Sequence, residues 1–295
     1  MLIFTADLHL SEKTPLCRTD DWLKTQARKL QWLEKLSCKY DAPVVCAGDL
    51  FHRFKVSHKF MGFCMDYLPR KFCTIAGNHD LPAHSMTLFE QSAMSVLEKA
   101  DRIKVLRGHC CLVELFGDSS LPEVFADNFG EHQEPESYQR DAIYIGHQLL
   151  DTEDKQLKEL KAHPFPVQVV GDYHVGALIQ QHKKILLIPG SFMRIAADQI
   201  DYQPQVWLLD DHGQIEGFSV PIEPVVSREH LAVVQDAEAR LDTFTESFIS
   251  RLDSGTQITL DFRANLRKFI EENNLEKEVA TTIWKIVEGN DEGNN

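Results

Sequence analysis

Five short apolar runs in this chain each end in side chains that bind metal ions. The runs are LIFTADLH, VVCAGDLFH, FCTIAGNHD, IYIGH and VVGDYH. Short apolar runs of this kind are typical of buried strands, and open α/β sheets place their ligands at the carboxyl ends of strands. The sequence therefore predicts an α/β fold in which several strand ends share one site. The metal-binding and acid–base residues in these runs are Asp7, His9, Asp49, Asn78, His79, Asp80, His147, Asp172 and His174.

Size and composition set the outer limits. With 295 residues and 43% hydrophobic content, the chain can form one large core or a core with a small appendage. No apolar stretch approaches the roughly 18 residues of a membrane span, and the first residues lack the basic start of a signal peptide. The seven cysteines form an odd set without a CxxC pair. We therefore expect reduced thiols and a cytoplasmic protein, in the host cytoplasm if a phage encodes it.

The formal net charge is −14, which by itself argues against a protein that binds nucleic acid, because neutralisation of phosphates drives that affinity. Bound divalent cations, however, reverse the field at the place where a phosphate sits. Any contact with DNA is therefore expected to be local, assisted by metal ions or helped by a partner.

Alternating strand-like and helix-like patterns organise the chain. Residues 2–5 and 43–47 are predicted as buried strands, and apolar residues between them recur at helical spacing from Trp22 to Leu36. Helices are expected at 57–68 and 85–99, and a loop at 128–140. A domain boundary is placed at residue 222, followed by a small C-terminal region, 223–295, with two amphipathic stretches and a polar tail. Further strands are predicted at 72–76, 104–106, 110–115, 141–145, 167–170, 184–188, 204–209 and 215–220.

The chemistry of each block is modest alone. Asp7 and His9 are two residues apart, so an extended backbone would point both side chains the same way, although a pair of this kind taken alone is more often a capped turn. Asp49 can bridge two cations, or cap a helix. In Gly77-Asn78-His79-Asp80, the asparagine offers a neutral oxygen ligand, the histidine a proton donor and the aspartate an acceptor that can fix the imidazole.

Taken together, the five blocks indicate a two-metal centre that cleaves phosphate esters. A folded core has no reason to place so many ionisable groups at strand ends. In such a centre, metal ions about 3.5 to 4 Å apart activate a shared water and neutralise the charge that develops on the phosphate.

The order DxH, GDLFH, GNHD, GH and GDxH resembles the calcineurin-like metallophosphoesterase superfamily. This resemblance covers residues 1–222 and implies a four-layer αββα sandwich, with two mixed sheets between layers of helices. In detail the chain is similar to SbcD-type DNA-repair nucleases and their phage counterparts. The features that carry this are His52 in GDLFH, Asp80 in GNHD, and the Ile188-Pro189-Gly190-Ser191 block with Arg194 shortly after it.

The resemblance also implies roles. One metal would be held by Asp7, His9 and His174, and the other by Asn78, His147 and Asp172, with Asp49 as a bridge. His79 would act at the scissile phosphate with Asp80 orienting its ring, and His52 would help to place the DNA phosphate. Asp172 departs from the usual GHxH pattern. Because a carboxylate is a hard ligand, this change favours Mn²⁺, with Mg²⁺ as the second choice.

The function expected from the resemblance is a DNA exonuclease or endonuclease that hydrolyses phosphodiesters with a metal-activated hydroxide, as a subunit of an SbcC/SbcD-like repair or recombination complex. The alternative is a phosphodiesterase or phosphatase for small molecules that uses the same centre. A metal-bound scaffold without catalysis is disfavoured, because His79 and Asp80 are present. Candidate contacts for DNA phosphates are Arg53, Lys55, Lys59, Arg70, Lys71, Lys183, Lys184 and Arg194, although ordinary surface positions explain each of them.

The resemblance further implies two protein partners. Residues 223–295 would dock on an SbcC-type, SMC-like ATPase or form a reduced cap, unless they pack back on the catalytic core. A homodimer would use the helices around 57–68 and 85–99, although core packing explains the same apolar residues. These residues are Met61, Phe63, Cys64, Met65, Leu88, Phe89, Met94 and Leu97.

Overall fold

A computed structural model describes residues 1–133, 136, 142–222, 270 and 281. The chain divides into two compact units, residues 1–231 and 232–295, and the description below concerns the first. The predicted amphipathic stretches of the C-terminal region lie outside the described residues, apart from Ile270 and Thr281. The domain boundary at residue 222 and the role of residues 223–295 therefore stay predictions.

Two six-stranded sheets form this unit. In the first sheet the neighbouring strands β1 to β4 are parallel, while β11 and β12 run antiparallel at one edge. Its spatial order is β12 (Ile215–Ser219), β11 (Gln205–Leu209), β1 (Leu2–Thr5), β2 (Val44–Cys46), β3 (Phe72–Thr74) and β4 (Lys104–Val105). In the second sheet β6, β7, β8 and β10 are parallel, with β5 and β9 antiparallel at the two edges. Its order is β5 (Gly108–Cys111), β6 (Glu123–Ala126), β7 (Ile143–His147), β8 (Val167–Gly171), β10 (Lys184–Ile188) and β9 (Ala177–Gln181).

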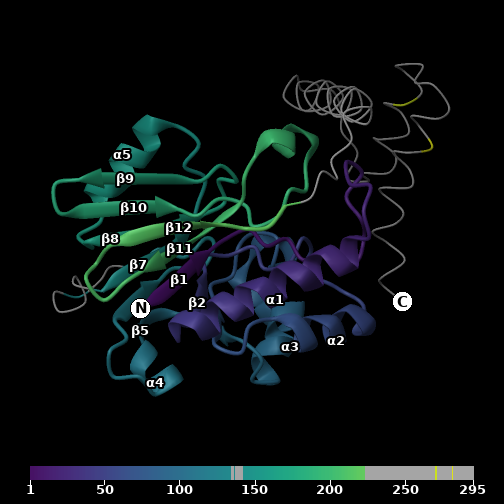
Figure 1. Cartoon of the computed structure of the whole chain (residues 1–295), viewed down its shortest axis with the longest axis horizontal. Coiled ribbons are helices and arrows are strands. Elements are labelled where there is room, and N and C mark those ends of the chain that lie inside the picture. Colours follow the sequence, from purple (N-terminus) through teal and green to yellow (C-terminus); the bar gives the residue numbers. More distant parts are fainter. Residues whose placement is uncertain (134–135, 137–141, 223–269, 271–280, 282–295) are drawn as a thin grey trace, which may run out of the picture. The chain divides into compact units, whose positions relative to one another are not determined.

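Helices cover both outer sides of the paired sheets. Figure 1 shows α1, α2 and α3 on one side and α5 on the opposite side. The α-helices are α1 (Trp22–Tyr40), α2 (His58–Tyr67), α3 (Ala93–Lys99), α4 (Leu112–Phe116) and α5 (Glu153–Ala162), and the 3-10 helices are η1 (Pro82–His84), η2 (Met86–Gln91) and η4 (Ala197–Asp201). Among the residues that the structure describes, no helix is long and apolar enough to cross a bilayer.

Three layers of buried side chains hold the sandwich together, because successive residues of a strand point to opposite faces. In β1, Ile3 packs toward α1, α2 and α3, whereas Leu2 and Phe4 pack between the two sheets. In β7, Ile143 and Ile145 face the same central layer, while Tyr144 packs on the outer side with Leu160 of α5. The predicted αββα sandwich is confirmed.

Most predicted elements form, with three kinds of difference. The strand expected at 110–115 is wrong beyond Cys111, because β5 ends there and α4 begins at Leu112. The helix expected at 85–99 is broken at Ser92, whose side chain accepts from the Ser95 N–H and starts α3. The elements β6, β9 and α5 were not predicted. Of α5, only Gln156 and Leu160 are buried, so its sequence carries little helical periodicity.

The predicted dimer surface is largely interior. Cys64, Phe89, Met94 and Leu97 lie in the core of this chain, so these four cannot supply an interface. Met65 is 37% exposed, and the homodimer itself stays a prediction. All seven cysteines are free thiols, as the sequence predicts.

Truncating a buried side chain of the central layer is expected to lower the stability of the protein strongly. Replacing Phe4 by alanine removes a fully buried ring between the sheets, and we expect the free energy of unfolding to fall by about 3–5 kcal/mol. Urea denaturation followed by circular dichroism measures this change. The control is Val96→Ala, at an exposed position of α3, expected to stay within about 0.5 kcal/mol of wild type. Similar losses in the two variants would contradict the assigned layers.

Candidate metal centre

All of the predicted ligand residues follow, or end, parallel strands of the two sheets. Asp7 and His9 come directly after β1, and Asp49 comes after β2. The remaining ligands come from one more strand of the first sheet and from two strands of the second. Asn78 follows β3, His147 is the last residue of β7, and Asp172 and His174 follow β8. The carboxyl ends of five parallel strands therefore supply one site, as predicted.

Polar contacts join the two sheets at this edge. The ring N–H at Nδ1 of His147 donates to the carbonyl oxygen of Ala47, at 2.8 Å. The backbone N–H of Asp172 lies 3.3 Å from each carboxylate oxygen of Asp7. Because His147 and Asp172 belong to one sheet and Ala47 and Asp7 to the other, these contacts fix the ligands of the two sheets relative to each other.

Four of the ligand residues have left-handed backbone conformations, with φ of 50° at Asp7, 45° at His9, 53° at Asp49 and 90° at Asp172. The expectation that an extended backbone aligns Asp7 and His9 is therefore wrong. Asp49 does not cap α2, whose N-cap is Ser57. Non-glycine residues adopt positive φ at a cost and concentrate at functional sites when they do.

Two glycines leave room for the ligand side chains. A Cβ atom on Gly77 would lie 2.2 Å from Oδ1 of Asp49, and one on Gly48, where φ is +93°, would lie 2.3 Å from Nδ1 of His147. Both distances are far below van der Waals contact. The glycines that precede the ligand blocks are therefore required for close approach, a role that their place in the motifs alone does not reveal.

The first group of ligand atoms comes from Asp7, His9 and His174, whose donor atoms lie within 4.8 Å of one another. The Nε2 atoms of His9 and His174 face each other at 3.0 Å. Burial lowers the pKa of both imidazoles, which favours the neutral form that offers a lone pair. The Nδ1 atom of His9 is buried and has no hydrogen-bond partner among the described residues.

The second group surrounds Asn78 and His147. Oδ1 of Asn78 lies 3.1 Å from Nε2 of His147, which in turn lies 3.8 Å from Oδ1 of Asp172. Turning the amide would place its nitrogen at the same point, 3.1 Å from His147 Nε2 and 3.3 Å from each oxygen of Asp49. In its present orientation the amide oxygen thus faces only acceptor atoms. A shared cation explains such convergence.

Asp49 stands between the two groups. Its Oδ2 lies 3.7 Å from Nε2 of His9, and its Oδ1 lies 3.6 Å from Nε2 of His147. One carboxylate oxygen therefore faces each group, as a bridging ligand requires. The structure brings the seven predicted ligands together, and their binding of metal stays a prediction.

The electrostatics of the centre favour cations. Burial raises the pKa of Asp7 to about 8, and the nearby charges of Asp49 and Asp172 add to this. Burial lowers the pKa of His147, but the carboxylates of Asp49 and Asp7 outweigh it and raise the value to about 10. Burial opposes ionisation of Asp49 as well, yet the facing imidazoles hold its pKa below the ordinary value. Clustered buried carboxylates are costly unless positive charge compensates them.

Hard oxygen donors and imidazoles are ligands that divalent cations such as Mn²⁺ bind, and a bound cation would replace the proton that the carboxylates of Asp49 and Asp7 draw to His147. The converging lone pairs and the compensated carboxylates therefore fit a pair of divalent cations, with Asp49 between them.

Asp80 does not orient the His79 ring as predicted. The His79 ring N–H at Nδ1 donates to the carbonyl oxygen of His52 at 2.9 Å, so this carbonyl, and not Asp80, orients the ring. The carboxylate of Asp80 is fully buried and accepts three backbone N–H groups. These belong to Leu50 at 3.1 Å, Phe51 at 2.8 Å and Gly77 at 3.0 Å. Asp80 thus ties the exit of β2 to the exit of β3.

The Pro189-Gly190-Ser191 block also supports the ligands. The backbone N–H of Ser191 donates to the carbonyl oxygen of His174 at 2.9 Å, and its Oγ lies 3.4 Å from the carbonyl oxygen of Asp7. The sequence did not predict Asn128, whose Oδ1 accepts from the Ala76 N–H at 2.8 Å and positions the exit of β3. No motif marks this asparagine.

Five of the eight candidate contacts for DNA are misplaced. Lys183 and Lys184 lie where the parallel strand β10 begins, at the edge of the sheet away from the centre, and Lys184 donates to the carbonyl oxygens of Leu160 and His163. Arg194 is 4% exposed and donates to the Ile200 carbonyl oxygen. Arg70 and Lys71 precede β3, so they lie at the opposite edge of the sheet from the centre, where they pair with Glu34 and Asp41. Arg53, Lys55, Lys59 and Lys183 are exposed.

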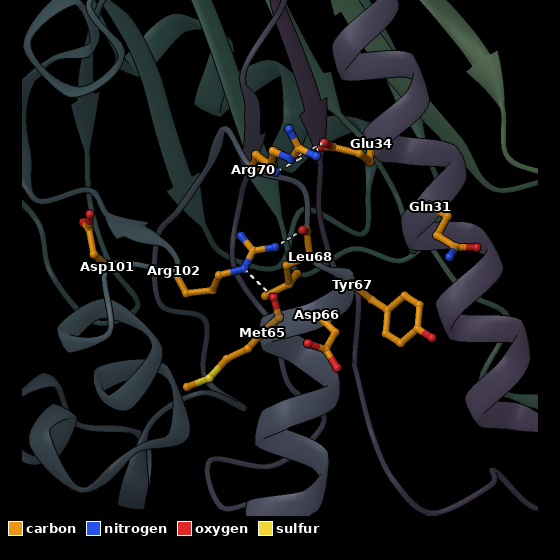
Figure 2. Close-up of a pocket in the computed structure, with 9 residues that line it drawn as sticks. All are labelled: Gln31, Glu34, Met65, Asp66, Tyr67, Leu68, Arg70, Asp101 and Arg102. Atoms are coloured by element: carbon orange, nitrogen blue, oxygen red, sulfur yellow. Dashed lines mark hydrogen bonds and ion pairs between the residues drawn. The ribbon is translucent and has the colours of Figure 1, made fainter.

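A cavity of about 440 Å³ lies at that opposite edge (Figure 2). Figure 2 shows Arg102 directed at Met65, in α2, and at Leu68, which follows it, and its nitrogens donate to the carbonyl oxygens of these two residues and of Pro69. This guanidinium satisfies carbonyl groups at the end of a helix. The cavity is therefore separate from the metal centre.

A family model described as calcineurin-like phosphoesterase matches residues 1–211. The chain belongs to the calcineurin-like phosphoesterase family. Membership indicates metal-dependent hydrolysis of phosphate esters at a dinuclear divalent-metal site, and the ligand groups described above provide candidates for that site.

Two solved structures are similar to this chain at low sequence identity. An archaeal phosphodiesterase is 12% identical over 74% of this chain and 98% of its own, with a TM-score of 0.40. Vps29 from Chaetomium thermophilum is 12% identical over 75% of this chain and 97% of its own, with a TM-score of 0.34. Similarity this low does not inform on substrate. Among curated protein sequences, none matches the chain.

Because Asp49 lies between the two groups of ligands, its replacement is expected to weaken metal binding. Asp49→Asn keeps the shape of the side chain and removes the negative charge that faces both histidine groups, so we expect affinity for Mn²⁺ to fall at least about tenfold. Calorimetric titration, with elemental analysis of the dialysed protein, measures the change. Asp41→Asn, at the far edge of the sheet, serves as control. If the Asp49→Asn protein binds two ions as tightly as wild type, the bridging role is contradicted.

Proposed function

We propose that the chain is a two-metal DNA nuclease that uses Mn²⁺ and hydrolyses phosphodiesters. The observation that carries the proposal is the pair of imidazoles at the open side of the centre. The rings of His52 and His79 stack with centroids 5.6 Å apart, and both stand edge-on to the ligand His9, at 5.6 and 4.9 Å. His52 is exposed, and the side chain of His79 is 39% exposed. A phosphate at the metal ions is thus within reach of both.

The bound cations would supply an activated water and neutralise the charge that develops on the phosphate. A residue of the chain itself would protonate the leaving group. Because the Nδ1–H of His79 donates to the carbonyl oxygen of His52, Nε2 is the ring nitrogen that can carry and release a further proton. That nitrogen lies 4.0 Å from Oδ2 of Asp49. These contacts support His79 as the group that would protonate the departing sugar oxygen.

Two groups position His79 against the ligands. Its backbone N–H donates to Oδ1 of Asp49 at 3.0 Å, which joins the proton donor to the bridging carboxylate. Asp80 holds the backbone on both sides of this contact, at Leu50 and Gly77. Asp80 is thus a positioning residue, and its loss is expected to disturb Asp49 and His79 together.

The choice of DNA rests on His52 of GDLFH, on Asp80 of GNHD, on the Pro189-Gly190-Ser191 block and on local positive charge. Arg53 and Lys55 follow His52 directly and are exposed, so they are suited to contact backbone phosphates near the centre. With a net charge of −14, the chain needs further help to hold DNA. We propose an SbcC-type ATPase partner that docks on residues 223–295, and a homodimer, in the cytoplasm.

The second candidate is a phosphodiesterase for nucleotides or other small esters, since the same centre can cleave them. Purified protein with Mn²⁺ is expected to release nucleotides from duplex DNA ends, alone or with the ATPase. If it leaves DNA intact in both conditions but turns over a small diester efficiently, the small-molecule function replaces the proposed one.

His79 separates catalysis from metal binding. His79→Ala removes the proton donor but none of the seven ligands, so we expect kcat to fall about 100- to 10,000-fold with the metal content unchanged. Initial rates on a phosphodiester and elemental analysis of the same sample provide the two readouts. A normal kcat would contradict the role of His79, and a loss of metal would assign it to the ligands. His109→Ala, on β5, is the matched histidine control.

A further inference from the structure

Two ring side chains outside the ligand set, His84 and Phe129, stand next to Asn78 and His147. Their ring centroids are 6.2 Å apart, with the rings edge to face, and the Phe129 ring is 6.3 Å from that of His147. His84 is exposed and Phe129 is partly exposed. They come from η1 and from the segment after β6, and the sequence alone gives no reason to join them.

Hydrogen bonds fix the two residues to the centre. The ring N–H at Nδ1 of His84 donates to the carbonyl oxygen of Asn78, at 2.9 Å, so the orientation of this imidazole is tied to the backbone of a ligand. The backbone N–H of Phe129 donates to the carbonyl oxygen of Ala76, also at 2.9 Å. The His84–Phe129 pair is therefore preorganised beside the second group of ligands.

The backbone at this point is strained. Ala83 and His84 have φ of 47° and 53°, and two successive left-handed residues without glycine are costly. Core packing does not explain the strain at His84, because its side chain is exposed. The conformation does bring the ring to the carbonyl of Asn78, which points to a role at the centre.

We propose that the His84–Phe129 pair binds the nucleobase of the nucleotide that carries the scissile phosphate. Planar aromatic rings stack on bases without regard to sequence, and the ring of Phe129 neighbours that of His147, which would hold the phosphate-binding metal. The substrate is then a nucleoside phosphodiester, in DNA or in a free nucleotide, and not a phosphoprotein or an alkyl phosphate. The inference rests on the proposed phosphodiesterase activity and narrows its substrate.

Two substrates with the same leaving group test the pair. The p-nitrophenyl ester of thymidine 5′-monophosphate carries a base, whereas methyl p-nitrophenyl phosphate does not. With Mn²⁺, Phe129→Leu and His84→Asn are each expected to lower kcat/KM for the nucleotide ester about tenfold, while kcat/KM for the methyl ester stays within about twofold. Asparagine keeps a side-chain donor and tolerates the left-handed backbone.

Tyr67→Leu, which removes a ring beside the cavity at the opposite edge (Figure 2), is the control and is expected to change neither value. Equal losses on both esters would show that the pair only positions the ligands, and unchanged values on both would show that it does not touch the base. Either result overturns the inference.

Calorimetry gives a readout that does not depend on turnover. The full chain with Mn²⁺ is expected to bind thymidine 5′-monophosphate about tenfold more tightly than methyl phosphate, and both variants are expected to lose this preference. If wild type cleaves neither ester yet keeps the preference, the proposed activity fails and the base-binding pair stands. Equal affinity of wild type for the two phosphates contradicts the pair, whatever the turnover.

Discussion

The contact between the carboxyl ends of β2 and β7 is the constraint on which the centre depends. The imidazole of His147, from one sheet, donates to the carbonyl oxygen of Ala47, from the other. This bond leaves Nε2 of His147 free to face the carboxylates. The approach is so close that a Cβ atom at Gly171 would lie 2.0 Å from the same carbonyl oxygen. If the sheets were further apart, the ligands of the two sheets would form two incomplete sites.

Two aspartates that follow the neighbouring strands β2 and β3 have different partners. Asp49 turns one oxygen toward each histidine group, whereas Asp80 uses both oxygens to accept backbone N–H groups. Their side chains are equally acidic in water, so only the surroundings distinguish them. Asp49 therefore faces both groups of candidate ligands, and Asp80 holds the backbone at the two strand exits.

The sequence was informative where chemistry and periodicity agree. The strand ends with their ligands and the βαβ start follow from short apolar runs and from the motifs that end them, and the αββα fold follows from the family resemblance that these motifs carry. The sequence could not show that Asp80 lies away from the His79 ring, because carbonyl acceptors such as that of His52 leave no mark in a motif. It also missed α5 and β9, since partly exposed elements lack a clear apolar period. Arg194 looked like a surface cation, and only its burial shows otherwise.

The left-handed backbone at Asp7, His9, Asp49 and Asp172 lowers the stability of the fold, although these four residues are ligands of the proposed centre. Glycine at any of these four positions would relieve strain of about 1 kcal/mol, so each is a place where a more stable protein is one substitution away. Every such substitution would also delete a ligand. Selection for thermal stability alone would therefore replace these ligands first. A stabilised form of the enzyme has to gain its stability in the layers between the sheets and helices.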